Sequence, residues 1–356
     1  MFNNFLTHLF LFIFLFLSSS VYSNPPNSTE DLLYTTLRIT CKTTVKTGAV
    51  ATEQTKVGTG YIYDFLERAP NTSTHTLLQT PPFVKKPYLV TNKHVIDNVQ
   101  IGELTFNISQ NNISPEEKFP IRIGQFLPQE TPFSEMFIRH PSVDLCAYSL
   151  SGAVRYVEDQ LGTEAHSKYK EEYNKYQTDY TALLTSHKQS YGAPFLAPPI
   201  KPLEKKVFYR SLSRENLVDF QTEEAIQDIM MVGYPMGIAD EENNLPVVRK
   251  GITSSHIRSN FQKKPEVLID AAVFPGSSGS PVFLCQHQGS NFFKAKLLGT
   301  AYAIPQYTAQ GIVCDSSDHM QCTPIPTIST STKIPSNLGF VIKATELSQL
   351  QTLILK

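Results

Sequence analysis

The chain has 356 residues and a formal net charge of −1, and 18% of its residues are charged. This length is sufficient for two lobes with separate cores or for one large β domain. The near-neutral net charge gives no electrostatic reason to expect nucleic-acid binding. The 22 Phe, 16 Tyr and 24 Pro residues, with no Trp, favour β structure with many turns.

An unbroken apolar run at residues 9–17 is followed by small and modest side chains that end in Val21-Tyr-Ser23. The run has the length of a signal-peptide core and is too short to cross a bilayer comfortably. Residues 1–23 are therefore predicted to be a signal peptide, and the mature chain to be periplasmic or secreted without a membrane attachment. An uncleaved membrane anchor is the alternative, because the leader has no Lys or Arg.

The first half of the chain predicts one β unit over residues 31–150. Residues 57–63 and 87–91 are expected to pair across a long hairpin loop at 67–86. An apolar strand is expected to begin at Asp144 and to end at Leu150. The other predicted strands are 36–41, 103–107 and 119–123.

Residues 151–206 interrupt this pattern and are interpreted as a helical insertion with a linker at 192–199. The tyrosines recur at spacings of 4, 3 and 4, which predicts an amphipathic helix. The favoured interpretation is that this stripe packs against the body of the protein, and the alternative is a partner-binding helix. The stripe consists of Tyr169, Tyr173, Tyr176 and Tyr180.

The last part, residues 207–356, predicts a second β unit that ends in a helix. Residues 310–337 are rich in Ser, Thr and Pro and are expected to form a polar loop. The terminal segment from Ala344 places Leu347, Leu350, Leu353 and Ile354 on one helical face, with Thr345 as a possible N-cap. The predicted strands are 228–234, 247–253, 267–270, 293–302 and 338–342.

The five cysteines give a mixed signal. Cys314 and Cys322 lie close together in the polar segment, where a local disulfide is compatible with an oxidising compartment. Cys41, Cys146 and Cys285 lie in strand-like apolar contexts and are interpreted as reduced core thiols. The spacings match no metal site, so neither a metal nor another cofactor is expected.

The sequence Phe-Pro-Gly-Ser-Ser-Gly-Ser-Pro at residues 274–281 carries the chemistry. Ser278 is the candidate nucleophile, but a serine hydroxyl reacts at neutral pH only with a base and an orienting acid nearby. His94 and Asp144 are the candidates, in the chain order His, Asp, Ser. The backbone amides of Gly276 and Ser278 would then bind the developing oxyanion.

Other residues were candidates for the same roles. Asp97 follows His94 by three residues, but it is interpreted as part of a solvated turn. Ser277 and Ser280 flank the nucleophile. His140 is expected to be structural or exposed, and His256 to lie on the surface.

These motifs together resemble the trypsin-like (chymotrypsin-fold) serine peptidases, in the bacterial branch that includes HtrA-type proteases. The resemblance rests on Thr91-Asn-Lys-His94, on Asp144-Leu-Cys-Ala and on Gly276-Ser-Ser-Gly-Ser-Pro281. It extends to residues 233–237, 250–254 and 338–342. It implies an all-β fold of two six-stranded barrels with the active site in the cleft between them, here with a helical insertion between the barrels and a C-terminal helix.

The departures from the family are also informative. No PDZ domain is expected after the closing helix. Ser277 occupies the place where animal digestive relatives have an Asp that receives a new N-terminus, so the site is expected to form without that ion pair. Ala272 occupies the place where trypsin has an Asp that selects basic side chains, so cleavage at small or apolar residues is expected.

The function predicted from the sequence is that of an exported serine endopeptidase acting on protein or peptide substrates through an acyl-enzyme. A catalytically silent binding protein on the same fold, with the tyrosine helix as a possible partner site, is the alternative from another class. An esterase with the same three residues cannot be separated from a peptidase by sequence.

Overall fold

A computed structural model describes most of the chain. The described residues are 26, 28–47, 50–69, 83–110, 114–123, 131–186, 199, 204–288, 292–315 and 323–356. The predicted signal peptide at residues 1–23 lies outside them, and so does Cys322 of the proposed disulfide.

The first lobe is a curved antiparallel sheet of eight strands. The hydrogen-bonded order is β5-β4-β1-β2-β3-β7-β6, and β8 pairs with β4. The predicted pairing of the second and third strands is confirmed, with Tyr61 opposite Val90. The strands are β1 (Thr36–Thr47), β2 (Val50–Arg68), β3 (Phe83–Thr91), β4 (Ile101–Ser109), β5 (Glu117–Ile123), β6 (Ile138–Arg139), β7 (Cys146–Ser149) and β8 (Lys206–Phe208).

The second lobe is a closed six-stranded antiparallel barrel in the order β10-β11-β16-β13-β12-β9. Alternate side chains of its strands fill the interior, where Val267, Ile269 and Val341 are fully buried. The strands are β9 (Asp228–Gly233), β10 (Val247–Thr253), β11 (Glu266–Asp270), β12 (Pro281–Gln288), β13 (Phe292–Ala303) and β16 (Leu338–Lys343). The all-β, chymotrypsin-like fold class is confirmed. The expectation of two six-stranded barrels holds for the second lobe only, because the first lobe is an eight-stranded sheet that does not close among the described residues.

The described helices are few, and they lie before, between or after the strands. The α-helices are α2 (Thr29–Leu33), α3 (Lys93–Ile96), α4 (Ser151–Ser186) and α5 (Leu347–Ile354). Short 3-10 turns are η1 (Phe133–Glu135), η2 (Arg214–Asn216), η3 (Pro235–Gly237), η4 (Phe261–Lys263) and η5 (Ala344–Glu346). None of the helices in the described ranges is both long and apolar enough to span a membrane.

A shared apolar core holds the two lobes together. Tyr61 and Phe65 of β2 pack in this core with Phe283 and Ile342 of the barrel, and all four are nearly inaccessible to solvent. The apolar face of α5 closes the core with Leu347 and Leu350. Removing this much apolar surface from water is the main favourable contribution to the association of the lobes.

The C-terminal helix is also tied to the first lobe by hydrogen bonds. The Gln351 side chain accepts from the amide of Leu66 and donates to its carbonyl, each at 2.8 Å. The predicted cap was wrong: α5 begins after a 3-10 turn, and the residue before it is Glu346, whose side chain makes no capping bond.

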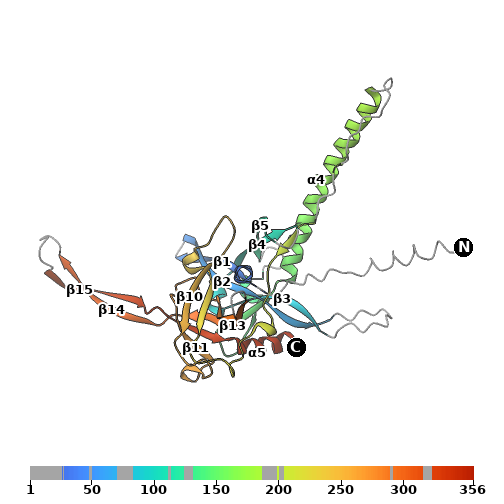
Figure 1. Cartoon of the computed structure of the whole chain (residues 1–356). Helices are drawn as coiled ribbons and strands as arrows, with labels where there is room; N and C mark the ends of the chain where they lie inside the picture. Colours follow the sequence, from blue (N-terminus) through green and yellow to red (C-terminus); the bar gives the residue numbers. More distant parts are fainter. Residues whose placement is uncertain are drawn as a thin grey trace.

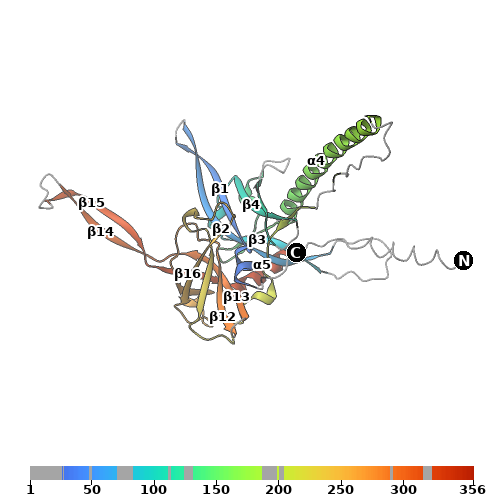
Figure 2. The same ribbon diagram turned by 45° about the horizontal axis from the view of Figure 1, so that its top comes forward.

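The predicted polar loop at 310–337 was largely wrong, because it is mostly a two-stranded ribbon. Its strands are β14 (Gln306–Asp315) and β15 (Thr323–Pro335), and they pair only with each other among the described strands. Thr and Ile side chains favour extended backbone, which the Ser- and Pro-rich composition obscured. The ribbon projects from the body (Figures 1 and 2).

The described rings of the tyrosine stripe, those of Tyr169, Tyr173 and Tyr176, do not pack against the body, so that interpretation was wrong for them. Helix α4 buries Val154, Val157 and Leu161 at its first turns. It then projects away from the sheets (Figures 1 and 2), and at 36 residues it is about 54 Å long. Tyr173 is 39% exposed.

The rings of the stripe contact one another instead of the body. Tyr173 lies 6.0 Å, centroid to centroid, from both Tyr169 and Tyr176.

Candidate active site

His94 is held at the edge of the first lobe by a one-turn helix. Strand β3 ends at Thr91, and α3 begins two residues later at Lys93. The Asn92 side chain donates to the Asp144 carbonyl (2.7 Å), so the turn is fastened to the loop that carries the candidate acid. The imidazole is 47% exposed and is therefore accessible from the cleft.

Asp144 lies in the loop before β7 and contacts His94 at two points. Its Oδ2 is 2.5 Å from His94 Nδ1, and its Oδ1 accepts from the His94 amide at 3.2 Å. The strand begins at Cys146, two residues after the position predicted. The carboxylate therefore belongs to a loop that can face the imidazole.

The charge state of Asp144 suits an orienting acid. Burial acts to raise the pKa of this carboxyl. The hydrogen bond and charge of His94, with the backbone amides of His94 and Lys93, outweigh burial and place the pKa below its ordinary value. The group is consequently a carboxylate at neutral pH and fixes the proton of the imidazole on Nδ1.

The serine loop presents two unused amide donors. Its five carbonyl groups, at residues 274–278, all accept hydrogen bonds. Their donors in chain order are the Ser277 amide (3.0 Å), the Met236 amide (2.6 Å), the Thr59 hydroxyl (2.8 Å), the Ser280 amide (3.0 Å) and the Thr59 amide (3.0 Å). Within the described part of the chain, the amides of Gly276 and Ser278 donate to no acceptor.

Glycines allow this arrangement. Gly276 has φ +91° and Gly279 has φ +88°, a region that other residues rarely adopt. A Cβ at Gly279 would lie 1.8 Å from the Thr59 carbonyl oxygen. The close approach of Gly279 to β2 brings Ser278 from the second lobe to the edge of the first, where His94 lies.

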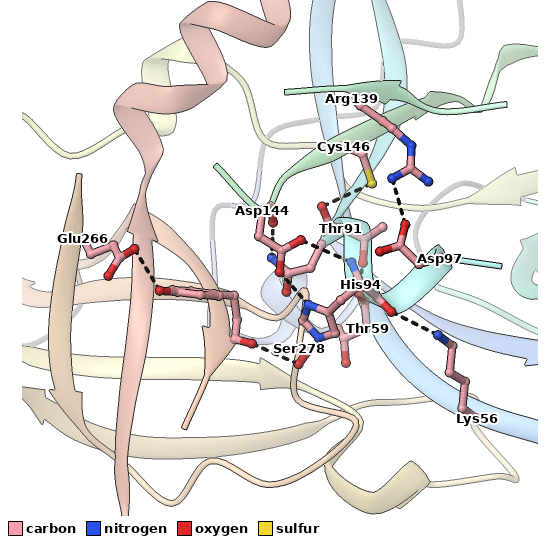
Figure 3. Close-up of polar contacts among 12 residues, drawn as sticks. Lys56, Thr59, Thr91, His94, Asp97, Arg139, Asp144, Cys146, Glu266 and Ser278 are labelled. Atoms are coloured by element: carbon pink, nitrogen blue, oxygen red, sulfur yellow. Dashed lines mark hydrogen bonds and ion pairs between the residues drawn. The ribbon is translucent and has the colours of Figure 1, made fainter. Parts of the chain in front are cut away.

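The side chains of His94, Asp144 and Ser278 lie beside one another (Figure 3). The Ser278 hydroxyl donates to the Tyr302 carbonyl at 3.4 Å. Tyr302 in turn donates from its hydroxyl to Glu266 (2.8 Å). The three residues expected from the sequence thus come from a one-turn helix and two loops. Asp144 bonds His94, whereas the Ser278 hydroxyl bonds Tyr302 and not His94.

The rival residues occupy other positions. Asp97 forms an ion pair with Arg139 (2.8 Å). Ser277 and Ser280 are fully buried. His256 is exposed and accepts from the amide of Arg258 in a turn.

Thr59, which the sequence reading did not single out, contacts the serine loop through both its amide and its hydroxyl. The available signal was a pair of glycines inside a strand, Gly58 and Gly60, since glycine in a strand often marks a close approach of another segment. A Cβ at either glycine would come within 2.5 Å of a neighbouring side chain.

Cys41, Cys146 and Cys285 are free thiols in the structure, as predicted; the first two are buried and Cys285 is half-buried. Cys41 and Cys146 are buried, and each donates to a backbone carbonyl of the segment that ends in α3. Burial raises the pKa of the Cys41 thiol to about 11, so it is not a thiolate nucleophile at neutral pH. No cluster of His, Cys, Asp or Glu that could hold a metal is found among the described residues.

His140 is buried behind the Asp144 loop, which decides between the structural and exposed alternatives. Its Nδ1 accepts from the amides of Ser142 and Val143, at 3.3 and 3.1 Å. Its Nε2 lies 3.4 Å from a Glu346 carboxylate oxygen without hydrogen-bond geometry. Burial, and secondarily the charge of Lys93, lower the pKa of His140 below 6.5.

The lowered pKa makes the fold sensitive to acid. Below pH 6.5 the unfolded chain binds a proton at His140 that the folded chain does not. The free energy of unfolding therefore decreases as the pH is lowered, by at most about 1.4 kcal/mol per pH unit. His140→Asn keeps an acceptor for the two amides and cannot titrate. We expect it to be less stable than wild type at pH 8, but to lose less stability between pH 7 and pH 5 in urea titrations.

The control for this measurement is His256→Asn, which should follow the wild-type curve. Burial also raises the pKa of Glu346, and that shift has the opposite sign, because its stabilisation is lost as pH rises. The difference between variants, not the wild-type curve alone, therefore reports on His140. Equal slopes for His140→Asn and wild type would contradict the assignment.

Comparison with known proteins agrees with this geometry. The model of the trypsin-like peptidase domain family matches residues 82–289, which is more than half of the chain. No curated protein matches the chain.

Two solved structures are similar to the chain, each at 12% identity. One is an HtrA-type protease, a serine-to-alanine variant of AlgW with a tripeptide, at a TM-score of 0.41 and over 92% of this chain. The chain spans 62% of the length of that protein. The other is the inactive form of a serine-to-alanine mutant of Rv3671c from M. tuberculosis H37Rv, with a TM-score of 0.33 and coverage of 94% of this chain and 97% of that one. From the extent of the family match, the chain belongs to the trypsin-like peptidase domain family.

Proposed function

We propose that this protein is an exported serine endopeptidase that uses Ser278, His94 and Asp144 as its catalytic residues. The observation that carries the proposal is the pairing of a 2.5 Å carboxylate–imidazole contact with a serine loop in which only two amides lack an acceptor among the described residues. Such a loop has its donors in place before a substrate binds.

The proposed reaction follows from these groups. Ser278 Oγ forms a bond to the scissile carbonyl carbon while its proton passes to His94 Nε2, and the carbonyl oxygen takes the displaced electron pair. The amides of Gly276 and Ser278 donate to this oxyanion. The carbon–nitrogen bond then breaks, and His94 gives its proton to the leaving amine.

Water then hydrolyses the acyl-enzyme, with His94 acting first as the base and then as the acid. It attacks the acyl group on Ser278 while His94 takes one of its protons. The ester bond breaks, His94 returns the proton to Ser278 Oγ, and the carboxylic acid leaves. Asp144 remains ionised and stabilises the imidazolium that forms in both halves.

Covalent labelling tests the proposal. A fluorophosphonate probe should label the full chain, and the label should map to Ser278. Absence of labelling at any pH would support the silent binding protein instead. Turnover of esters without turnover of peptides would support the esterase. The N-terminal sequence of the labelled protein made by its own cells would test export, because retention of residues 1–23 contradicts it.

We also propose that the substrate residue before the cut bond is small or apolar. Ala272 is half-buried between β11 and the serine loop, and it brings no charge to the position where a basic side chain would need one. A peptide library should therefore be cut mainly after small or apolar residues. Dominant cleavage after Lys or Arg would contradict the proposal.

A further inference from the structure

We propose that Thr59 is the positioning residue of the oxyanion-binding loop, acting from the opposite lobe. The inference rests on the proposed function, because it concerns the same two amides. Thr59 does not touch the reacting atoms. It holds the carbonyl groups of Gly276 and Ser278, the two residues whose amides would bind the oxyanion.

All three polar groups of Thr59 are used in this contact region, and the residue is fully buried. Its hydroxyl accepts from the Tyr234 amide (3.0 Å) and donates to the Gly276 carbonyl (2.8 Å). Its amide donates to the Ser278 carbonyl (3.0 Å). Its own carbonyl accepts from the Thr91 hydroxyl (2.7 Å), three residues before His94.

The direction of the hydroxyl proton is determined by these partners. The Tyr234 amide can only donate, so the Thr59 oxygen is the acceptor there. Its single proton is then free to bond the Gly276 carbonyl, which can only accept. The result is a chain of two hydrogen bonds from the second lobe through Thr59 and back to the serine loop.

The loop needs such an external partner. A peptide unit is planar, with the carbonyl of one residue and the amide of the next pointing in opposite directions, so a carbonyl that is held fixes the plane of its own unit. The Gly276 amide belongs to the unit of the Pro275 carbonyl, and the Gly276 carbonyl belongs to the unit that follows. Gly276 at φ +91° has access to other backbone conformations at little cost. Rotation about Gly276 would turn its amide away from the cleft unless both neighbouring carbonyls were held.

Both neighbouring carbonyls are held in the structure. The Met236 amide bonds the Pro275 carbonyl (2.6 Å), and the Thr59 hydroxyl bonds the Gly276 carbonyl. Ser277 is uncharged, and its hydroxyl accepts from the Phe274 amide at 3.4 Å, which ties the loop only to itself. The conformation therefore depends on neutral hydrogen bonds, and Thr59 supplies two of them.

The matched substitution is Thr59→Val, which keeps the branched shape and removes the hydroxyl. It leaves the Gly276 carbonyl and the Tyr234 amide without their partner. We expect the second-order rate of fluorophosphonate labelling and kcat for a peptide substrate to fall about 100-fold, with KM little changed. Thr59→Ser restores the hydroxyl and should recover most of both rates, which a loss of packing alone would not allow.

Thr253→Val is the control. Thr253 is also fully buried, accepts from the Gln227 amide (2.9 Å) and donates to the Ala225 carbonyl (3.2 Å), all outside the proposed site. It should lose comparable stability in urea titrations but keep the wild-type labelling rate per folded molecule. If Thr59→Val does not fold, Thr59→Ala serves as the second variant, and a wild-type rate in it overturns the proposal.

The outcomes separate the two proposals. If the wild type is labelled, and Thr59→Val and Thr253→Val are labelled at equal rates, the role of Thr59 is overturned and the proposed function stays intact. Failure of the wild type to label overturns the proposed function, and the role of Thr59 with it. A slow Thr59→Val that Thr59→Ser rescues supports both.

Discussion

Replacing Ser278 by alanine is expected to lower kcat for peptide hydrolysis by roughly 10⁶-fold and to abolish fluorophosphonate labelling. The reason is that no other hydroxyl in the loop can take its place. Ser277 is fully buried, and so is Ser280, whose hydroxyl has no hydrogen-bond partner among the described residues. The measurement is single-turnover hydrolysis of a fluorogenic peptide by the purified full chain.

Ser280→Ala is the matched control, because it makes the same change two residues away in the same loop. It should keep kcat close to wild type. The double variant His94→Ala with Ser278→Ala should be no slower than Ser278→Ala alone, since the residues act as one unit. Persistent, specific hydrolysis by Ser278→Ala would place the nucleophile elsewhere.

Sequence patterns were sufficient to select the three residues that we propose as catalytic, because each lies next to a recognisable strand. His94 follows the end of β3, and Asp144 precedes β7. Ser278 precedes β12, between two glycines that need positive φ. Local patterns of period 2 and of turn residues specify these positions without knowledge of the packing.

The surroundings of the site were not predictable in the same way. Thr59 reaches the serine loop across 217 positions of sequence, and no local pattern encodes such a contact. The same limit applies to the buried His140, whose environment is completed by Glu346 from the C-terminal turn η5. Both cases depend on how the lobes pack, which is decided by the shared core and not by any one segment.

The two projecting elements show where periodicity was misleading. A 4-3-4 spacing predicts that one face of a helix is apolar, but not that this face is covered. Helix α4 is packed only as far as Leu161, where its small buried side chains end. Ribbon β14–β15 was missed because its composition does not distinguish a loop from a strand. Thr and Ser occur in both.

Asp144→Asn should lower kcat by about 10⁴-fold at neutral pH while leaving the fold intact. The asparagine side chain can still accept the His94 amide through its oxygen. Its NH₂ group then faces His94 Nδ1, which must become an acceptor, so the proton moves to Nε2 and the imidazole can no longer deprotonate Ser278. Asp97→Asn is the control, and it should keep wild-type kcat because that carboxylate pairs with Arg139 outside the site.

The same variant gives a second, independent readout in acid. Because the Asp144 pKa is depressed in the folded chain, its contribution to stability is fully present above the ordinary value of 3.8 and is lost as pH falls through the lower folded value. The gap in unfolding free energy between wild type and Asp144→Asn should therefore narrow as the pH falls below about 4. A gap that does not depend on pH would mean that His94 does not hold this carboxylate. A reduced kcat together with a gap that does not depend on pH would then mean that Asp144 acts without the 2.5 Å contact to His94.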